Sequence, residues 1–88
     1  MHIVNIKFMS SVTNIEISKA IENLICDSRQ EIGCIQYDVF ENVEDFHSFV
    51  FIECWQTPLS LENHKNAAGI QKFKLAVGHL IKDKNVLG

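Results

Sequence analysis

The stretch Phe49-Val50-Phe51-Ile52-Glu53-Cys54-Trp55 decides the fold of this chain. Its aromatic and β-branched side chains are typical of a strand, and alternate residues of a strand point to opposite faces of a sheet. One face therefore carries Phe49, Phe51, Glu53 and Trp55, and the other carries Val50, Ile52 and Cys54. Because both faces are largely apolar, both must be covered by other parts of a protein.

Three further strands are expected around this one. Residues 2–8 alternate in the period of a strand, and residues 34–41 are rich in β-branched and aromatic side chains. Residues 34–41 and 46–55 should pair antiparallel, since the polar stretch 42–45 between them has the length of a hairpin turn. Residues 85–88 have room for only a stub of a final strand.

The first helix is expected from about Asn14 to Ile32. Thr13 and Glu16 fit a capping box, in which the Thr13 hydroxyl accepts from a backbone amide and Glu16 returns the bond. Gly33 should stop the helix. The expected apolar stripe contains Ile17, Ala20, Ile21, Leu24, Ile25 and Ile32.

A second helical region is expected after Trp55. Thr57 is a cap residue, and Pro58 follows at the first helical position, where its missing amide costs nothing. This helix carries His64, and Gly69 marks a break after it. The apolar stripe expected beyond the break contains Ile70, Phe73, Val77, Leu80 and Ile81.

The order strand, helix, strand, strand, helix, strand predicts an α+β, ferredoxin-like fold with helices on one face of a four-stranded antiparallel sheet. Its 88 residues, 47% of them hydrophobic, are enough for a single domain spanning 1–88. The helices of one chain cover only one face of the sheet. We therefore expect a homodimer that packs sheet to sheet through the face carrying Val50 and Ile52.

Charge and cysteine content exclude several classes of protein. The formal net charge of −3 argues against a nucleic-acid partner. Cys26, Cys34 and Cys54 are odd in number and lack metal-knuckle or redox spacing, so we expect reduced thiols with packing roles in a cytoplasmic protein. No apolar stretch approaches the ~20 residues that span a membrane, and neither a secretory leader nor a metal site is predicted.

The stretch 31–40, the strand ending in Trp55, His64 on the next helix and Phe73 beyond it resemble the antibiotic biosynthesis monooxygenase family. The resemblance covers residues 5 to about 73. It implies a dimeric α/β-barrel and, in cofactor-independent oxygenases, a pocket lined by an asparagine on the first strand and a tryptophan ending the third. Asn5 and Trp55 match these places, and His64 matches the family's recurrent histidine.

The predicted catalytic residues are His64, Asn5 and Trp55. A histidine titrates near neutrality and can take a phenolic proton, which is the first need of a quinol oxidation without flavin or metal. Trp55 offers a surface on which a flat aromatic substrate can stack, and a buried Asn5 needs a partner or a ligand. Glu53 either orients His64 or pairs with a lysine. The predicted substrate-binding residues are Glu53, Phe49, Phe51 and Phe73, and no role is assigned to His2, His47 or His79.

The leading hypothesis is a cofactor-independent monooxygenase that acts with molecular oxygen on a small quinol or polycyclic phenol. The alternatives are a small-molecule isomerase, in which His64 and Glu53 shuttle a proton, and a non-catalytic dimeric ligand-binding domain. Haem degradation is disfavoured, because it requires an axial histidine on the last helix and residues 70–76 contain none. A late cluster of lysines is either a solvated face or an anion-attracting rim: Lys65, Lys72, Lys74, Lys82 and Lys84.

Overall fold

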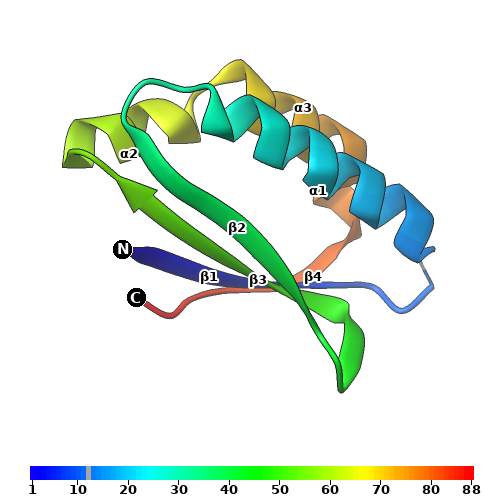
Figure 1. Cartoon of the computed structure of the whole chain (residues 1–88). Helices are drawn as coiled ribbons and strands as arrows, with labels where there is room; N and C mark the ends of the chain where they lie inside the picture. Colours follow the sequence, from blue (N-terminus) through cyan, green and yellow to red (C-terminus); the bar gives the residue numbers. More distant parts are fainter. Residues whose placement is uncertain (12) are drawn as a thin grey trace.

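The computed structural model describes residues 1–11 and 13–88 (Figure 1). The elements follow in the order β1 (His2–Phe8), α1 (Asn14–Arg29), β2 (Cys34–Asn42), β3 (Asp45–Trp55), α2 (Pro58–Lys65), α3 (Ala68–Val77), the short 3₁₀ helix η1 (Gly78–Leu80) and β4 (Ile81–Val86). The strands form one antiparallel sheet in the order β2-β3-β1-β4. The helices lie over one face of this sheet (Figure 1), so the predicted α+β, ferredoxin-like fold is confirmed.

The core lies between the sheet and the two longer helices. Phe8 and Phe73 pack edge to face with centroids 6.5 Å apart, and Phe51 packs on Phe73 at 6.2 Å. These aromatic pairs tie β1 and β3 to α3. The buried apolar side chains are Val4, Ile6, Phe8, Ile17, Ala20, Ile21, Leu24, Tyr37, Phe49, Phe51, Phe73 and Val77.

The first helix is shorter than predicted. It ends at Arg29 with Gln30 as its C-cap, and Ile32 is 94% exposed, so Ile32 does not belong to the apolar stripe. Gly33 has a φ of +87°, which only glycine adopts without strain, and this residue turns the chain from the helix layer into β2. Residues 30–32, which the sequence pattern predicts as the last turn of the helix, form this connection instead.

The predicted capping box does not form. Thr13 is the N-cap of α1 and has an extended backbone, but its side chain makes no capping hydrogen bond. Its main-chain oxygen accepts instead from the amide of Ile17 at 3.5 Å. Because Thr13 is exposed, water can satisfy the amides of the first turn in place of its hydroxyl.

The start of α2 is as predicted. The Thr57 hydroxyl accepts from the amide of Ser60 at 3.1 Å, and Pro58 takes the first helical position. The break that follows lies before Gly69, which is inside α3. A Cβ at Gly69 would lie 2.9 Å from the Cβ of Asp27 on α1, so this glycine permits close packing of the two helices rather than ending one.

The end of the chain forms a longer strand than predicted. The last helix stops at Val77, so Leu80 lies in η1 and Ile81 begins β4. Five of the six residues of β4 pair with β1, and Lys82 falls at a register shift opposite Lys7 and Phe8. The sequence did not predict this strand at full length, because residues 82–85 are polar. Polar residues are tolerated there since β4 is an edge strand with most side chains exposed.

The sheet face away from the helices is apolar at its centre. Strand register places Ile3 beside Ile52 and Phe40 beside Val50 on this face, and Phe40 is 55% exposed. The predicted apolar character of both faces is therefore observed, whereas the homodimer stays a prediction. Among the described residues, no helix combines the length and apolar character that crossing a membrane requires.

Candidate functional site

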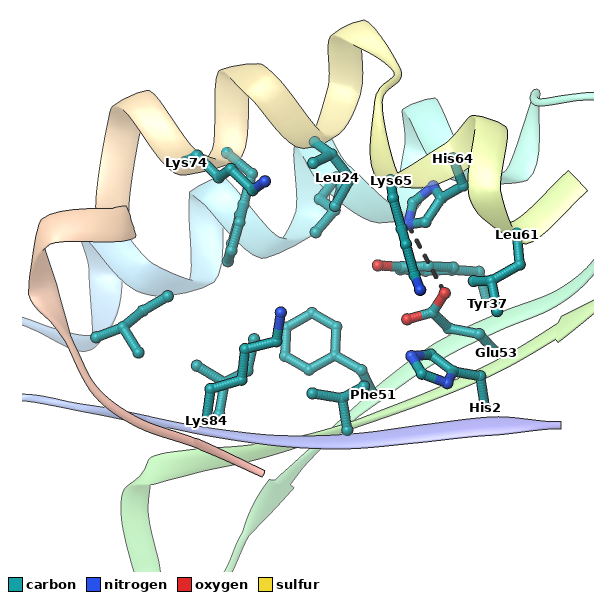
Figure 2. Close-up of a pocket in the computed structure, with 15 residues that line it drawn as sticks. His2, Leu24, Tyr37, Phe51, Glu53, Leu61, His64, Lys65, Lys74 and Lys84 are labelled. Carbon is teal, nitrogen blue, oxygen red and sulfur yellow. Dashed lines mark ion pairs between the residues drawn. The ribbon is translucent and has the colours of Figure 1, made fainter. Parts of the chain in front are cut away.

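A cavity of about 230 Å³ lies between the helix-covered face of the sheet and the helices (Figure 2). Apolar side chains from the sheet and from α1 and α3 form most of its wall, and acidic and basic groups stand at its edges. The residues around it are His2, Val4, Ile6, Leu24, Tyr37, Phe51, Glu53, Leu61, His64, Lys65, Ile70, Phe73, Lys74, Ile81 and Lys84.

His64 is an almost fully enclosed polar group of this cavity. It lies on α2 and is only 3% exposed. Its Nδ1 lies 2.8 Å from Oε1 of Glu31, which follows the end of α1. When Nδ1 carries the proton that Glu31 accepts, the lone pair of Nε2 is left for another partner.

Glu53 is the second buried polar group, at 5% exposure on β3. Its Oε1 lies 3.7 Å from Nε2 of His64, which is too long for a hydrogen bond (Figure 2). The same oxygen accepts from Nε1 of Trp55 at 3.0 Å, and the indole ring lies against the imidazole with centroids 4.7 Å apart. Glu31, His64, Glu53 and Trp55 therefore form one connected polar network.

Two other ionisable groups near this network stay protonated. Burial raises the pKa of Tyr37, and the charges of Glu53 and Glu31 raise it further, so its phenol does not ionise at neutral pH. Partial burial followed by the same two carboxylates raises the pKa of the Cys34 thiol. Neither group is suited to act as a base, which leaves His64 and the glutamates for proton transfer.

The prediction that Asn5, Trp55 and His64 share one cavity is wrong for Asn5. Val4 and Ile6 point toward the helices, so Asn5 between them points to the open face of the sheet. There its Oδ1 accepts from the Ser48 hydroxyl at 3.0 Å. The hydrogen-bond partner of the half-buried Asn5 amide is thus the Ser48 side chain. This pair lies on the other face of the sheet from His64.

The predicted substrate-binding residues divide in a similar way. Glu53, Phe51 and Phe73 line the cavity. Phe49 is buried in the core against Phe8, with centroids 5.9 Å apart, and does not reach the cavity. Trp55 meets His64 but borders a neighbouring surface hollow, which shares only two residues with the cavity.

Several residues of the site were not predicted. Glu31 sits just beyond a helix end, and nothing in its spacing indicates that it meets a histidine 33 positions later. Tyr37 and His2 also line the cavity. Strand parity could have found Tyr37, since it is the cross-strand partner of Glu53. The catalytic and binding roles predicted from the sequence for His64, Trp55, Glu53 and the phenylalanines stay predictions.

The acidic, histidine and cysteine side chains do not form a metal-ligand set. Within residues 1–11 and 13–88, no three of them gather in an arrangement that could hold an ion. Cys26, Cys34 and Cys54 are free thiols.

Comparison with known proteins finds relatives of this chain. One curated relative is the "Putative monooxygenase YcnE" of Bacillus subtilis (strain 168), 36% identical over 52 residues, which are 59% of this chain. The match spans about half (55%) of that relative's length.

Solved structures resemble nearly the whole chain. PA3566 from Pseudomonas aeruginosa is 27% identical with a TM-score of 0.86 and covers 97% of this chain and 85% of its own. The "Putative antibiotic biosynthesis monooxygenase" from Nitrosomonas europaea shares the fold with a TM-score of 0.90 at 18% identity, over 98% of this chain and 83% of its own. A family model for antibiotic biosynthesis monooxygenase matches residues 14–75, and the chain belongs to this family.

Proposed function

We propose that this protein is a monooxygenase that inserts oxygen into a small quinol without a bound cofactor. One observation carries the proposal. His64 is buried, is oriented by Glu31 through Nδ1, and turns Nε2 toward a cavity whose other polar wall is Glu53. An oriented imidazole beside an apolar cavity is the arrangement that general-base catalysis on a phenol requires.

The size of the cavity favours a single aromatic ring. An engineered apolar cavity of ~150 Å³ holds benzene, so about 230 Å³ accommodates a benzene ring with small substituents. Phe51 and Phe73 supply apolar contacts for such a ring. A polycyclic phenol would need the cavity to widen, so we narrow the substrate to a monocyclic quinol.

In the proposed mechanism, a phenolic hydroxyl lies between Nε2 of His64 and Oε1 of Glu53. These two atoms are 3.7 Å apart and do not form a hydrogen bond with each other. Nε2 removes the phenolic proton, and Glu31 stabilises the imidazolium that forms. Glu53 is held in place by the Trp55 indole, and its negative charge adds to the stabilisation of the imidazolium.

The quinol alone then supplies the electrons that reduce dioxygen. The quinolate passes one electron to dioxygen, and the resulting superoxide and semiquinone combine at a ring carbon to give a peroxide. The peroxide loses water and leaves a hydroxyquinone. One oxygen atom ends in the ring and the other in water, and the quinol supplies all four electrons, so the reaction needs no other reductant.

The same two groups also favour a second candidate, an isomerase. Nε2 of His64 and the Glu53 carboxylate both border the cavity and could remove and return a proton on a small carbonyl compound. In that case the enzyme exchanges substrate hydrogen with solvent and consumes no oxygen. A non-catalytic ligand-binding domain would do neither.

We also propose that the protein is a cytoplasmic homodimer that packs through the open sheet face. Val50 and Ile52 lie at the centre of this face, and the pair of Asn5 and Ser48 gives it a polar group that could fix the register of two sheets. The three free cysteines are consistent with a reducing compartment.

Oxygen uptake tests the proposed activity. Methylhydroquinone in air-saturated buffer should drive oxygen consumption above autoxidation, and ¹⁸O₂ should place one labelled atom in the product. Incubation in D₂O with small ketones tests the isomerase. Oxygen consumption no faster than in buffer, across a panel of monocyclic quinols, would reject the monooxygenase.

A further inference from the structure

Three lysines from three different elements border the cavity. Lys65 comes from α2, Lys74 from α3 and Lys84 from β4. Figure 2 shows Lys74 and Lys84 on the side of the cavity away from Glu53 and His64, with both ammonium groups directed toward the space between sheet and helices. We refer to Lys65, Lys74 and Lys84 as the lysine rim.

The charges of the lysine rim are poorly compensated. Within the described chain, Lys74 and Lys84 make no ion pair, and Lys65 makes only a long one of 3.9 Å with Glu62. By contrast, Lys7 on the open face pairs with Asp45 at 2.9 Å. The chain has eleven acidic residues and only eight basic ones, so the gathering of unpaired cations at this cavity is not an effect of overall charge.

From this arrangement we infer that the ligand of the cavity is an anion: a monocyclic quinol that carries a carboxylate, bound with the carboxylate at Lys74 and Lys84. The quinol in this inference rests on the proposed function, and the carboxylate on the quinol is the new part. A carboxylate at the lysine rim gains charge-assisted hydrogen bonds in a partly apolar site.

The two ends of the cavity also set the direction of binding. Glu53 would repel a substrate carboxylate placed near His64, whereas a neutral phenolic hydroxyl meets no such repulsion. Lys74 and Lys84 attract the carboxylate at the opposite end of the cavity (Figure 2). The charge pattern therefore brings the hydroxyl of the substrate, and not its carboxylate, to Nε2 of His64.

Two matched ligands separate charge from shape. Gentisate (2,5-dihydroxybenzoate) is a quinol with a carboxylate, and its methyl ester keeps the ring and both hydroxyls without the charge. Binding is measured by calorimetry under anaerobic conditions at low ionic strength. We expect gentisate to bind at least about fivefold more tightly than the ester, and added salt to weaken gentisate alone.

Two matched double variants locate the effect. Lys74→Gln/Lys84→Gln removes two rim charges, whereas Lys72→Gln/Lys82→Gln removes two charges from the same elements at positions that do not line the cavity. All four side chains are exposed, so both variants should fold. The rim variant should lose the preference for gentisate, and the control should keep it.

The outcomes also distinguish this inference from the proposed function. Equal binding of gentisate and its ester, no binding of gentisate at millimolar concentration, or equal losses in the two double variants would overturn the anionic ligand. Oxygen uptake with methylhydroquinone tests the monooxygenase separately, because that quinol has no carboxylate. Rim-dependent binding of gentisate without any oxygen consumption would keep the inference and reject the monooxygenase.

Discussion

The two faces of the sheet use the same strands for different purposes. On the helix-covered face, β3 presents Phe51 and Glu53 to a cavity that also holds His64. On the open face, the same strand presents Val50 and Ile52, which no part of the described chain covers. Because side chains alternate along this strand, one face carries a polar network suited to proton transfer and the other carries an apolar surface suited to association.

The position of each polar group shows the difference most clearly. Glu53 on β3 and His64 on α2 are buried, both contact Trp55, and His64 also contacts Glu31 in the segment after α1. Asn5 on the open face meets only Ser48 from the adjacent strand. A change at His64 should therefore act on chemistry, whereas a change on the open face should act on assembly.

The largest effect is expected from His64→Ala. Loss of a general base should lower the rate of quinol-dependent oxygen uptake by roughly 10²–10⁴-fold. The defect should shrink at high pH, where the quinol ionises without help. An oxygen electrode and a pH series from neutral to alkaline measure both effects.

Glu31→Gln is the matched control for this variant. Glutamine can still accept from Nδ1 of His64 but carries no charge, so the ring keeps its orientation and the imidazolium loses its counter-ion. We expect a smaller loss than in His64→Ala. Full activity of folded His64→Ala, with folding checked by circular dichroism, would remove His64 from the mechanism.

The next effect is expected from Ile52→Glu on the open face. If two copies pack through this face, a buried carboxylate without a partner should give a monomer or an insoluble product. Sedimentation velocity at micromolar concentration measures the change. Lys19→Glu, on the exposed surface of α1, is the control and should leave the dimer intact. A wild-type protein that sediments as a monomer would refute the homodimer.

The strands and the architecture were predictable because their patterns are local. Alternation at residues 2–8 and the polar turn at 42–45 gave the positions of β1 and of the hairpin within a residue. The face of the sheet toward which each residue points can also be predicted from the alternation along a strand. That alternation alone would have placed Asn5 on the other face of the sheet from Val4. The family resemblance, not the residue pattern, led to the wrong grouping of Asn5 with His64.

The polar network was only partly predictable because it joins distant parts of the chain. Glu53 and Trp55 share a face of β3, so their contact follows from spacing. Glu31 reaches His64 from the segment between the end of α1 at Arg29 and the turn at Gly33; the glycine has a sequence signal, but the end of α1 before it does not. The late lysines were visible as a cluster, but their place around the cavity depends on where α3 ends and β4 begins.

A smaller effect on the helix-covered face is expected from Gly33→Ala. The positive φ strains any side chain, and the new Cβ would lie 2.6 Å from the Cβ of Ser60 on α2. We expect the free energy of unfolding to fall by roughly 1–3 kcal/mol, measured by urea denaturation. Gly78→Ala is the control, since its Cβ would meet nothing nearer than 3.6 Å. Equal stability of the two variants would show that α2 adjusts freely.

The smallest effect is expected from Asp45→Asn at the start of β3, where Asp45 pairs with Lys7 of the open face. Lys7 donates to Asp45 at 2.9 Å and lowers the pKa of this carboxyl below its ordinary value of 3.8, while Asp45 raises the pKa of Lys7 above 10.5. The carboxylate therefore adds stability above the pKa of an unfolded aspartate and loses it as pH falls through the lower folded value.

Asparagine can still accept from the amide of His47, so this variant removes only the charge. Thermal melts should show a slight loss of stability at neutral pH relative to wild type, which vanishes at acid pH when the aspartate is protonated. Because both side chains are partly exposed, salt should also diminish the difference. A difference that persisted unchanged at acid pH would mean that Asp45 acts through its shape or packing and not through its charge.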